Sequence, residues 1–156
     1  MPAVTVVCRQ ATLEDVEPLA VMIEEYARRG IMLPRSREVL RRQIDNFVVA
    51  EEDGKVIGCG SLCLLGPDLV EIRSLGIMEG NQGKGIGSKL VNRLIELAIQ
   101  QEIPKIMALT YEVSFFVKNG FTVVPMDVFP EKVWTDCIHC AKRDRCDEIA
   151  VLKVIG

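Results

Sequence analysis

A glycine-rich hexapeptide, Gln82-Gly83-Lys84-Gly85-Ile86-Gly87, is the stretch of this sequence with the clearest chemical meaning. It follows an apolar run, residues 72–78, and opens a helical pattern over residues 86–101. A glycine-rich turn between a strand and a helix exposes several backbone N–H groups at the positive end of the helix dipole, and such groups bind anions. Glycines also let the backbone approach a diphosphate without Cβ atoms in the way. The hexapeptide predicts a diphosphate site; the alternative is a turn that only reverses the chain.

The order of residues in the loop argues against two common nucleotide motifs. The Walker pattern requires a Lys-Ser/Thr pair after its last glycine, whereas Gly87 is followed by Ser88 and then Lys89. The dinucleotide fingerprint requires a third glycine where Leu90 stands. The pattern that fits is Q-x-x-G-x-G, and its meaning depends on the elements around it.

Those elements alternate between strand and helix patterns. Thr12 and Ser36 each precede a helical pattern as an N-cap, and Asp53-Gly54 between two apolar runs predicts a hairpin. The predicted strands are residues 4–9, 47–52, 55–59, 69–78, 105–109, 121–124 and 148–155. The predicted helices run from Thr12 to Gly30, after Ser36, and over residues 86–101 and 113–119.

Length and composition indicate one globular domain, residues 1–156, with 49% apolar and 26% charged residues. The net charge of −3 argues against a general nucleic-acid binder. No apolar run approaches the roughly 18–20 residues that span a bilayer, and the first ten residues do not read as a signal peptide. We therefore expect a cytoplasmic protein that binds neither nucleic acid nor membranes.

Taken together, these features resemble the GNAT N-acetyltransferases over nearly the whole chain. The resemblance is carried by the element order, the Asp53-Gly54 hairpin, Gln82 to Gly87, and residues 115–121. More narrowly, the chain resembles the short, stand-alone bacterial N-acetylglutamate synthases, in residues 29–36, 47–50, 71–75, 109–111 and 132–137. The resemblance implies an α/β (α+β) GNAT fold, with a central, mostly antiparallel mixed sheet flanked by about four helices.

The resemblance also implies an activity: transfer of an acetyl group from acetyl-CoA to the α-amine of an amino acid, in a ternary complex. The implied acceptor is L-glutamate, and the product, N-acetylglutamate, would serve arginine biosynthesis. The diphosphate would bind the glycine loop, and the pantetheine arm would bind backbone groups where two central strands separate. A homodimer is a family-level expectation. The implied cofactor-binding residues are Leu75, Gly76, Ile77, Gln82, Gly83, Lys84, Gly85, Ile86, Gly87, Ser88 and Phe116.

Candidates for proton transfer follow from the same strand and its neighbour. Glu71, Arg73 and Leu75 share one strand face by period 2, which is also compatible with a solvated face. Related enzymes place a glutamate here, so the resemblance favours Glu71 as the general base. Many members carry a tyrosine where Phe115-Phe116 stands, and it protonates the thiolate. Tyr111 is the nearest alternative acid, although it can equally be a core or rim tyrosine, with water protonating the thiolate.

The planar guanidinium of arginine suits the two carboxylates of glutamate, because it can bind a carboxylate through two parallel hydrogen bonds. Arg35, Arg37 and Arg73 are the candidates, and Ser74 and Thr110 can add neutral hydrogen bonds. The arginines at positions 28, 29, 41 and 42 are interpreted as solvated helix charges.

A cysteine cluster near the C-terminus has a spacing that permits zinc. Cys137, His139, Cys140 and Cys146 offer three thiolates and an imidazole for a tetrahedral site. Binding of one ion by adjacent His139 and Cys140 is awkward, so reduced thiols or a labile Cys137–Cys140 disulfide are favoured over zinc.

Two other functions remain compatible with the sequence. One is a GNAT enzyme for another amine, such as a polyamine, a drug or a protein N-terminus, for which acidic rather than arginine residues would line the acceptor site. The other is a non-catalytic module that senses CoA or a metal.

Overall fold

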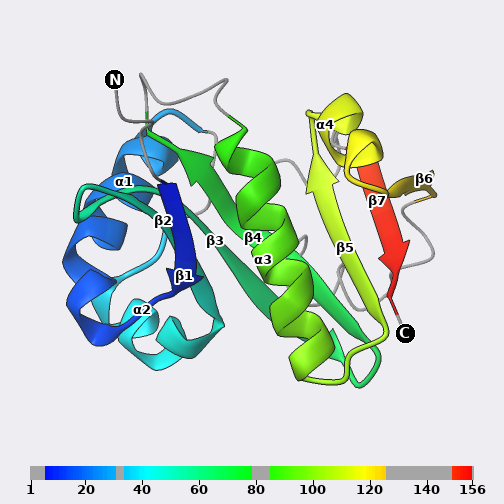
Figure 1. Ribbon diagram of the computed structural model, residues 1–156, viewed down its shortest axis with the longest axis horizontal. Helices are drawn as coiled ribbons and strands as arrows, with labels where there is room; N and C mark the ends of the chain where they lie inside the picture. Colours follow the sequence, from blue (N-terminus) through cyan, green and yellow to red (C-terminus); the bar gives the residue numbers. More distant parts are fainter. Residues whose placement is uncertain (1–5, 31–33, 79–84, 126–148, 156) are drawn as a thin grey trace. The chain divides into compact units, whose positions relative to one another are not determined.

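The computed structural model describes residues 6–30, 34–78, 85–125 and 149–155. Its elements follow the predicted order, with two short 3-10 turns added (Figure 1). The strands are β1 (Val6–Gln10), β2 (Phe47–Glu52), β3 (Lys55–Gly66), β4 (Leu69–Ile77), β5 (Lys105–Thr110), β6 (Thr122–Val124) and β7 (Ile149–Val154). The helices are η1 (Leu13–Asp15), α1 (Val16–Arg28), α2 (Arg37–Gln43), η2 (Ile44–Asn46), α3 (Ile86–Gln100) and α4 (Val113–Lys118).

The strands form a mixed sheet in the order β1-β2-β3-β4-β5-β7-β6. The pairs β1–β2, β2–β3, β5–β7 and β6–β7 are antiparallel, and β4–β5 is parallel. A parallel pair needs a crossover, and α3 supplies it between β4 and β5. The predicted fold class, a mostly antiparallel mixed sheet with four α-helices, is confirmed.

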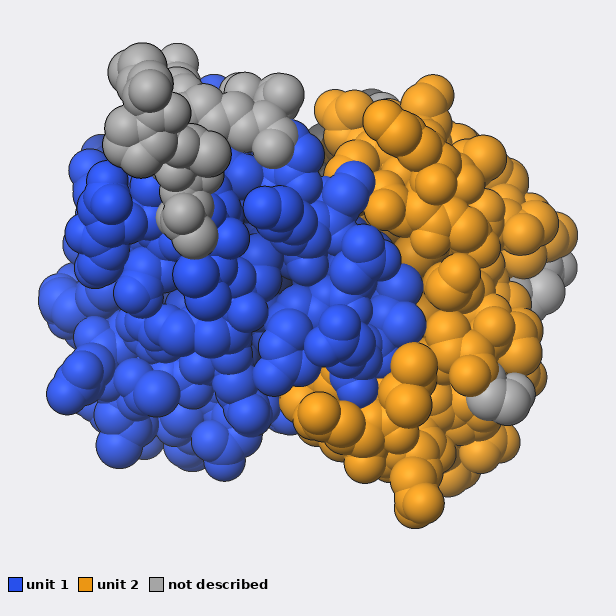
Figure 2. All heavy atoms as spheres, viewed as in Figure 1, with its two compact units in different colours: residues 1–62, 73–96 blue, residues 63–72, 97–156 orange. Residues whose placement is uncertain are grey.

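The chain divides into two compact units (Figure 2). The first contains residues 1–62 and 73–96, and the second contains residues 63–72 and 97–156. Strands β3 and β4 and helix α3 each contribute residues to both units. None of the helices in the described parts of the chain is long and apolar enough to cross a membrane.

In the first unit, strand alternation gives β2 and β3 two different faces. Val49 pairs with Cys59, and both lie in a buried cluster with residues of α1 and α2. Gly58 and Gly60 face α3 instead, since a Cβ on Gly60 would lie 2.9 Å from Leu94 Cδ1. The two glycines therefore let α3 pack closely on β3. Strand β3 continues past Cys59 to Gly66, because these glycines lie beneath a helix and do not break the strand.

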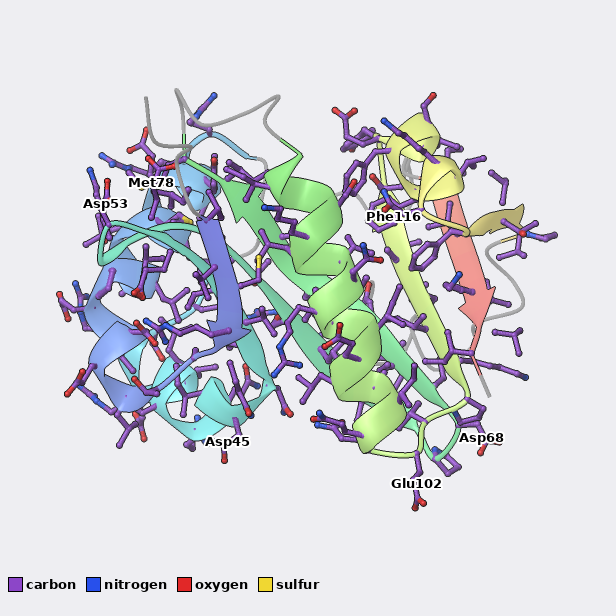
Figure 3. All side chains as sticks on the ribbon, in the orientation of Figure 1. Asp45, Asp53, Asp68, Met78, Glu102 and Phe116 are labelled. Carbon is purple, nitrogen blue, oxygen red and sulfur yellow. The ribbon has the colours of Figure 1, made fainter. Side chains whose placement is uncertain are left out.

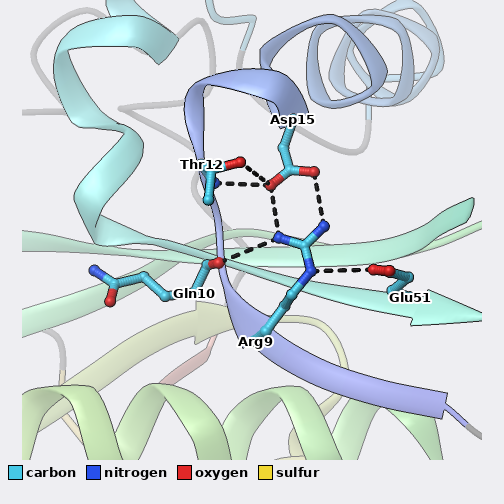
Figure 4. Close-up of polar contacts among 5 residues, drawn as sticks. All are labelled: Arg9, Gln10, Thr12, Asp15 and Glu51. Atoms are coloured by element: carbon cyan, nitrogen blue, oxygen red, sulfur yellow. Dashed lines mark hydrogen bonds and ion pairs between the residues drawn. The ribbon is translucent and has the colours of Figure 1, made fainter. Parts of the chain in front are cut away.

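An ion-pair network joins β1, η1 and β2 in the same unit (Figure 4). Arg9 donates two hydrogen bonds to the Asp15 carboxylate, at 2.8 and 3.0 Å, and one to Glu51 at 3.1 Å. The amide of Thr12 donates to the same carboxylate at 2.7 Å, as in a capping box. Burial alone would raise the pKa of Asp15, but the hydrogen bonds from Arg9 and Thr12 outweigh it and hold the pKa below its usual value.

The turns and caps follow the sequence chemistry closely. Asp53 and Gly54 both have positive φ, 52° and 78°, as a two-residue type I′ hairpin turn requires, so the predicted hairpin is confirmed (Asp53 is labelled in Figure 3). The Ser36 hydroxyl accepts from the amide of Val39 at 3.2 Å and caps α2, as predicted.

In the second unit, β5 lies between a parallel and an antiparallel neighbour. It pairs with β7 over six residues, and with β4 only over Leu69–Glu71. A buried cluster of Leu65, Leu69, Met107 and Ala150 packs on these strands. Helix α4 ends at Lys118, and the φ of 95° at Gly120 confirms the predicted left-handed stop just after it.

Candidate functional site

The structure describes the end of the glycine loop and the helix that follows it. Gly85 has φ of 75°, a backbone conformation that favours glycine, and α3 begins at the next residue, Ile86. The first N–H groups of an α-helix have no preceding turn whose carbonyls could accept them, and α3 begins at Ile86. The predicted strand-loop-helix context therefore exists on both sides of the loop. Gln82, Gly83 and Lys84 lie outside the described residues.

In strand β4, Ser74 has φ of 55°, in the left-handed region, and we interpret this irregularity as a bulge. The carbonyl of Arg73 accepts from Ser61 Oγ at 3.0 Å, and the carbonyl of Ser74 accepts from Cys59 Sγ at 3.1 Å. Successive carbonyls of a regular strand point to opposite edges, whereas both of these are bound by side chains of β3. The bulge also interrupts the side-chain alternation. The prediction that Glu71, Arg73 and Leu75 share one face assumes a regular strand, which Ser74 interrupts.

After the bulge, two hydrogen bonds indicate which backbone N–H groups of β4 face β3. The amide of Gly76 hydrogen-bonds the sulfur of Cys59, and the amide of Met78 donates to the carbonyl of Ile57 at 2.7 Å. Because backbone groups alternate along a strand, the N–H groups of Leu75 and Ile77 point away from β3. Leu75, Gly76 and Ile77 are expected to contact the pantetheine, and of these Gly76 already has its N–H hydrogen-bonded to a residue of β3.

Glu71 is a buried carboxyl group at the last residue pair of the β4–β5 ladder. It is 2% exposed and pairs with Met107. A solvated strand face, the alternative interpretation of this residue, is therefore wrong for Glu71. Buried carboxylates are rare in protein interiors and frequently functional.

Two of the three candidate acceptor arginines lie near the start of α2. Arg37 donates three hydrogen bonds to Glu17 of α1, at 2.7 to 3.0 Å, so its guanidinium joins the two helices. Arg35 lines a surface depression between α1 and residues 34–37, together with Glu24 and Arg28. The third candidate, Arg73, is partly buried in β4.

The model of the acetyltransferase (GNAT) family matches residues 13–121 of this chain. The chain belongs to the GNAT family. As a GNAT protein it is an N-acetyltransferase that uses acetyl-CoA, and the loop before α3 and the bulged strand β4 are parts of a GNAT domain.

Individual GNAT relatives match more of the chain. An uncharacterized N-acetyltransferase of Chlorobaculum tepidum is 38% identical over 99% of this chain and 100% of its own length. An amino-acid acetyltransferase of Mycobacterium tuberculosis is 36% identical over 76% of this chain and 69% of its own. The N-acetylglutamate synthase of Neisseria gonorrhoeae, solved with coenzyme A and N-acetyl-glutamate, is similar with a TM-score of 0.83 and 26% identity. That similarity covers 99% of this chain and 36% of the synthase chain.

In the second unit of this GNAT chain, the predicted residues differ in their surroundings. Phe116, labelled in Figure 3, is buried. It packs edge-to-face on Phe115 and Phe121, with ring centroids 5.1 and 5.2 Å apart. Tyr111 is 55% exposed, so it is not a core tyrosine. Thr110 is buried, and its hydroxyl accepts from the amide of Glu112 at 2.7 Å.

The cysteine cluster lies outside the described residues. Within the described ranges, no group of His, Cys, Asp and Glu side chains is arranged to hold a metal ion. The zinc alternative for Cys137, Cys140 and Cys146 therefore stays a prediction.

The sequence did not indicate three side chains that contact β4. Cys59 and Ser61 in β3 hydrogen-bond the bulge, and the hydroxyl of Tyr26 in α1 donates to the carbonyl of Ile77. In the sequence, Cys59 reads only as a core residue, and nothing marks Ser61. Their role depends on the left-handed Ser74, which no sequence pattern predicted.

Proposed function

We propose that this GNAT enzyme acetylates the α-amine of L-glutamate, and that it supplies N-acetylglutamate to arginine biosynthesis in the cytoplasm. The observation that carries the proposal is the similarity of almost the whole chain to an N-acetylglutamate synthase that was solved with its product. The amino-acid acetyltransferase name of a 36% identical relative supports the same acceptor class.

The proposed reaction is direct attack in a ternary complex. The amine nitrogen of glutamate bonds to the thioester carbonyl carbon, the carbon–sulfur bond breaks, and coenzyme A leaves as a thiolate. Glu71 takes the proton from the amine, directly or through water, and Tyr111 or water gives a proton to the thiolate. Holding both substrates together supplies much of the rate acceleration, and a general base adds about 10²–10⁴-fold.

The cofactor would bind along elements of the first unit. In this proposal the diphosphate contacts the loop from Gln82 to Gly87 and the first amides of α3, up to Ser88. The pantetheine amides pair with backbone groups of β4 that point away from β3, those of Leu75 and Ile77. Phe116 of α4, which is buried among aromatic rings, stays a predicted cofactor contact.

The acceptor would be held by arginines. Arg35, Arg37 and Arg73 are the candidates for the two carboxylates, and Arg37 would have to leave its ion pair with Glu17. Ser74 and Thr110 would add neutral hydrogen bonds; the Thr110 hydroxyl accepts one from Glu112 and keeps its proton for donation.

A panel assay tests this function. Release of CoA is measured with acetyl-CoA and each common amino acid, with spermidine and with a peptide N-terminus, and the metal content of the same sample is determined. We expect L-glutamate to give the highest kcat/KM. A higher kcat/KM for an amine without a carboxylate would contradict the acceptor assignment, and no turnover with any amine would contradict an enzymatic role.

A further inference from the structure

We propose that Cys59 and Ser61 are positioning residues that hold the bulge of β4, and thereby select which backbone groups of β4 meet the pantetheine arm of acetyl-CoA. This inference rests on the proposed placement of the pantetheine along β4. Both residues lie in β3 and in the same compact unit as the bulge, residues 73–77. Neither side chain needs to touch a substrate to act in this way.

The first support is the unusual backbone of Ser74. A left-handed residue other than glycine is uncommon inside a strand and persists only where its surroundings stabilise it. Here the surroundings are two side-chain donors. Ser61 Oγ binds the carbonyl before the bulge, that of Arg73, and Cys59 Sγ binds the carbonyl of Ser74 itself.

The second support is that Cys59 contacts both sides of the bulge. Its thiol donates a hydrogen bond to the carbonyl of Ser74, and its sulfur accepts one from the amide of Gly76. Burial raises the pKa of the Cys59 thiol to about 12, although the Gly76 amide opposes this. The group is therefore a neutral thiol at physiological pH and keeps the proton that it donates.

The third support is the direction in which the backbone groups after the bulge point. A bulge adds one residue, so it exchanges the edges to which all later backbone groups point. With the bulge in place, Gly76 and Met78 direct their amides to β3 and leave Leu75 and Ile77 directed away from it. In a strand without the bulge, the amides of Gly76 and Met78 would face away from β3 instead. The hydroxyl of Tyr26 supports the same backbone orientation, because it donates a hydrogen bond to the carbonyl of Ile77.

The test compares two ligands that differ by the pantetheine arm and the phosphate that carries it. Coenzyme A contains both, whereas adenosine 3′,5′-bisphosphate keeps only the nucleotide part. Titration calorimetry measures both affinities for the wild type, for Ser61→Ala and for Cys59→Ala with Ser61→Ala. The conservative variants Ser61→Thr and Cys59→Ser keep a donor at each position. Val49→Ala is the matched control, because Val49 pairs with Cys59 and packs in the same buried cluster, while its side chain offers no hydrogen-bond donor.

We expect the double variant to bind coenzyme A about tenfold more weakly and the bisphosphate with unchanged affinity, since each lost hydrogen bond weakens the bound conformation by roughly threefold to fivefold. Ser61→Thr and Cys59→Ser should restore most of the loss. Val49→Ala should lower the melting temperature and leave both affinities unchanged. If the double variant does not fold, Ser61→Ala alone should show the selective loss, at about threefold.

The proposal is overturned if both ligands weaken equally, if neither weakens, or if Val49→Ala reproduces the selective loss. Its failure is distinct from failure of the proposed function. A wild-type chain that binds coenzyme A but does not acetylate glutamate would refute the acceptor, while the comparison of the two ligands would still decide the role of Cys59 and Ser61.

Discussion

At the scale of single residues, the proposed chemistry depends on a carboxylate that the fold buries. Glu71 lies at 2% exposure in β4, at the last pair of its ladder with β5. The burial of Glu71 favours the proposed role over a charge on a solvated strand face, two interpretations that the sequence alone did not distinguish.

Replacing Glu71 by Gln tests that role. The amide keeps the size of the side chain but cannot accept the proton of the amine. We expect kcat to fall by about 10²–10⁴-fold, while the affinity for coenzyme A stays unchanged. Steady-state kinetics and calorimetry measure the two quantities. Glu102→Gln, an exposed position, is the control and should behave as wild type. A fall in kcat of less than about tenfold would remove Glu71 as the base.

Arg73 carries the prediction for acceptor recognition. Arg73→Ala removes a guanidinium that the proposal places on a carboxylate of glutamate. The KM for glutamate should rise by about 10-fold or more, as expected for a lost charge-assisted hydrogen bond, with a much smaller change in the KM for acetyl-CoA. Arg42→Ala, on the exposed side of α2, should change neither. Equal effects on both KM values would count against a carboxylate contact at this residue.

At the scale of elements, the network around Arg9 holds β1, η1 and β2 together (Figure 4). Asp15→Asn removes a buried negative charge beside Arg9, so the free energy of unfolding at pH 7 should fall by about 2–3 kcal/mol. Urea denaturation measures this value. Asp45→Asn, at an exposed position, is the matched control and should stay within about 0.5 kcal/mol of wild type.

The same network predicts a dependence on pH. The pKa of Asp15 is lower in the folded protein than in the unfolded chain, where it is about 3.9. Its contribution to stability is therefore fully present above about pH 4 and is lost as the pH falls through the folded pKa. The difference in stability between wild type and Asp15→Asn should shrink between pH 5 and pH 2. A difference that stays constant over this range would show that Asp15 is not paired as described.

The order and type of elements could be predicted from the sequence because caps and turns act locally. Ser36, Asp53-Gly54 and Gly120 each specify a nearby backbone conformation, and all three predictions are confirmed. The bulge could not be predicted, since Ser74 adopts its left-handed conformation through donors 13 to 15 residues away. Likewise, the pair between Arg37 and Glu17 spans 20 residues and depends on how α1 and α2 pack.

At the scale of the whole molecule, the chain divides into two compact units that share β3, β4 and α3. The sequence predicts a single domain over residues 1–156, and this stays a prediction. A single domain should unfold in one calorimetric transition, with equal calorimetric and van't Hoff enthalpies. Two resolved transitions would show that the units unfold independently. Light scattering on the same sample would test the expected homodimer.

The most direct test of the account is a competition experiment. The purified chain is given acetyl-CoA with equal concentrations of L-glutamate, L-aspartate, L-glutamine and spermidine, and the acetylated products are identified by mass spectrometry. The account predicts that N-acetylglutamate is the main product and that its formation disappears in Glu71→Gln. Acetylspermidine as the main product, or N-acetylglutamate formed equally well by Glu71→Gln, would contradict it.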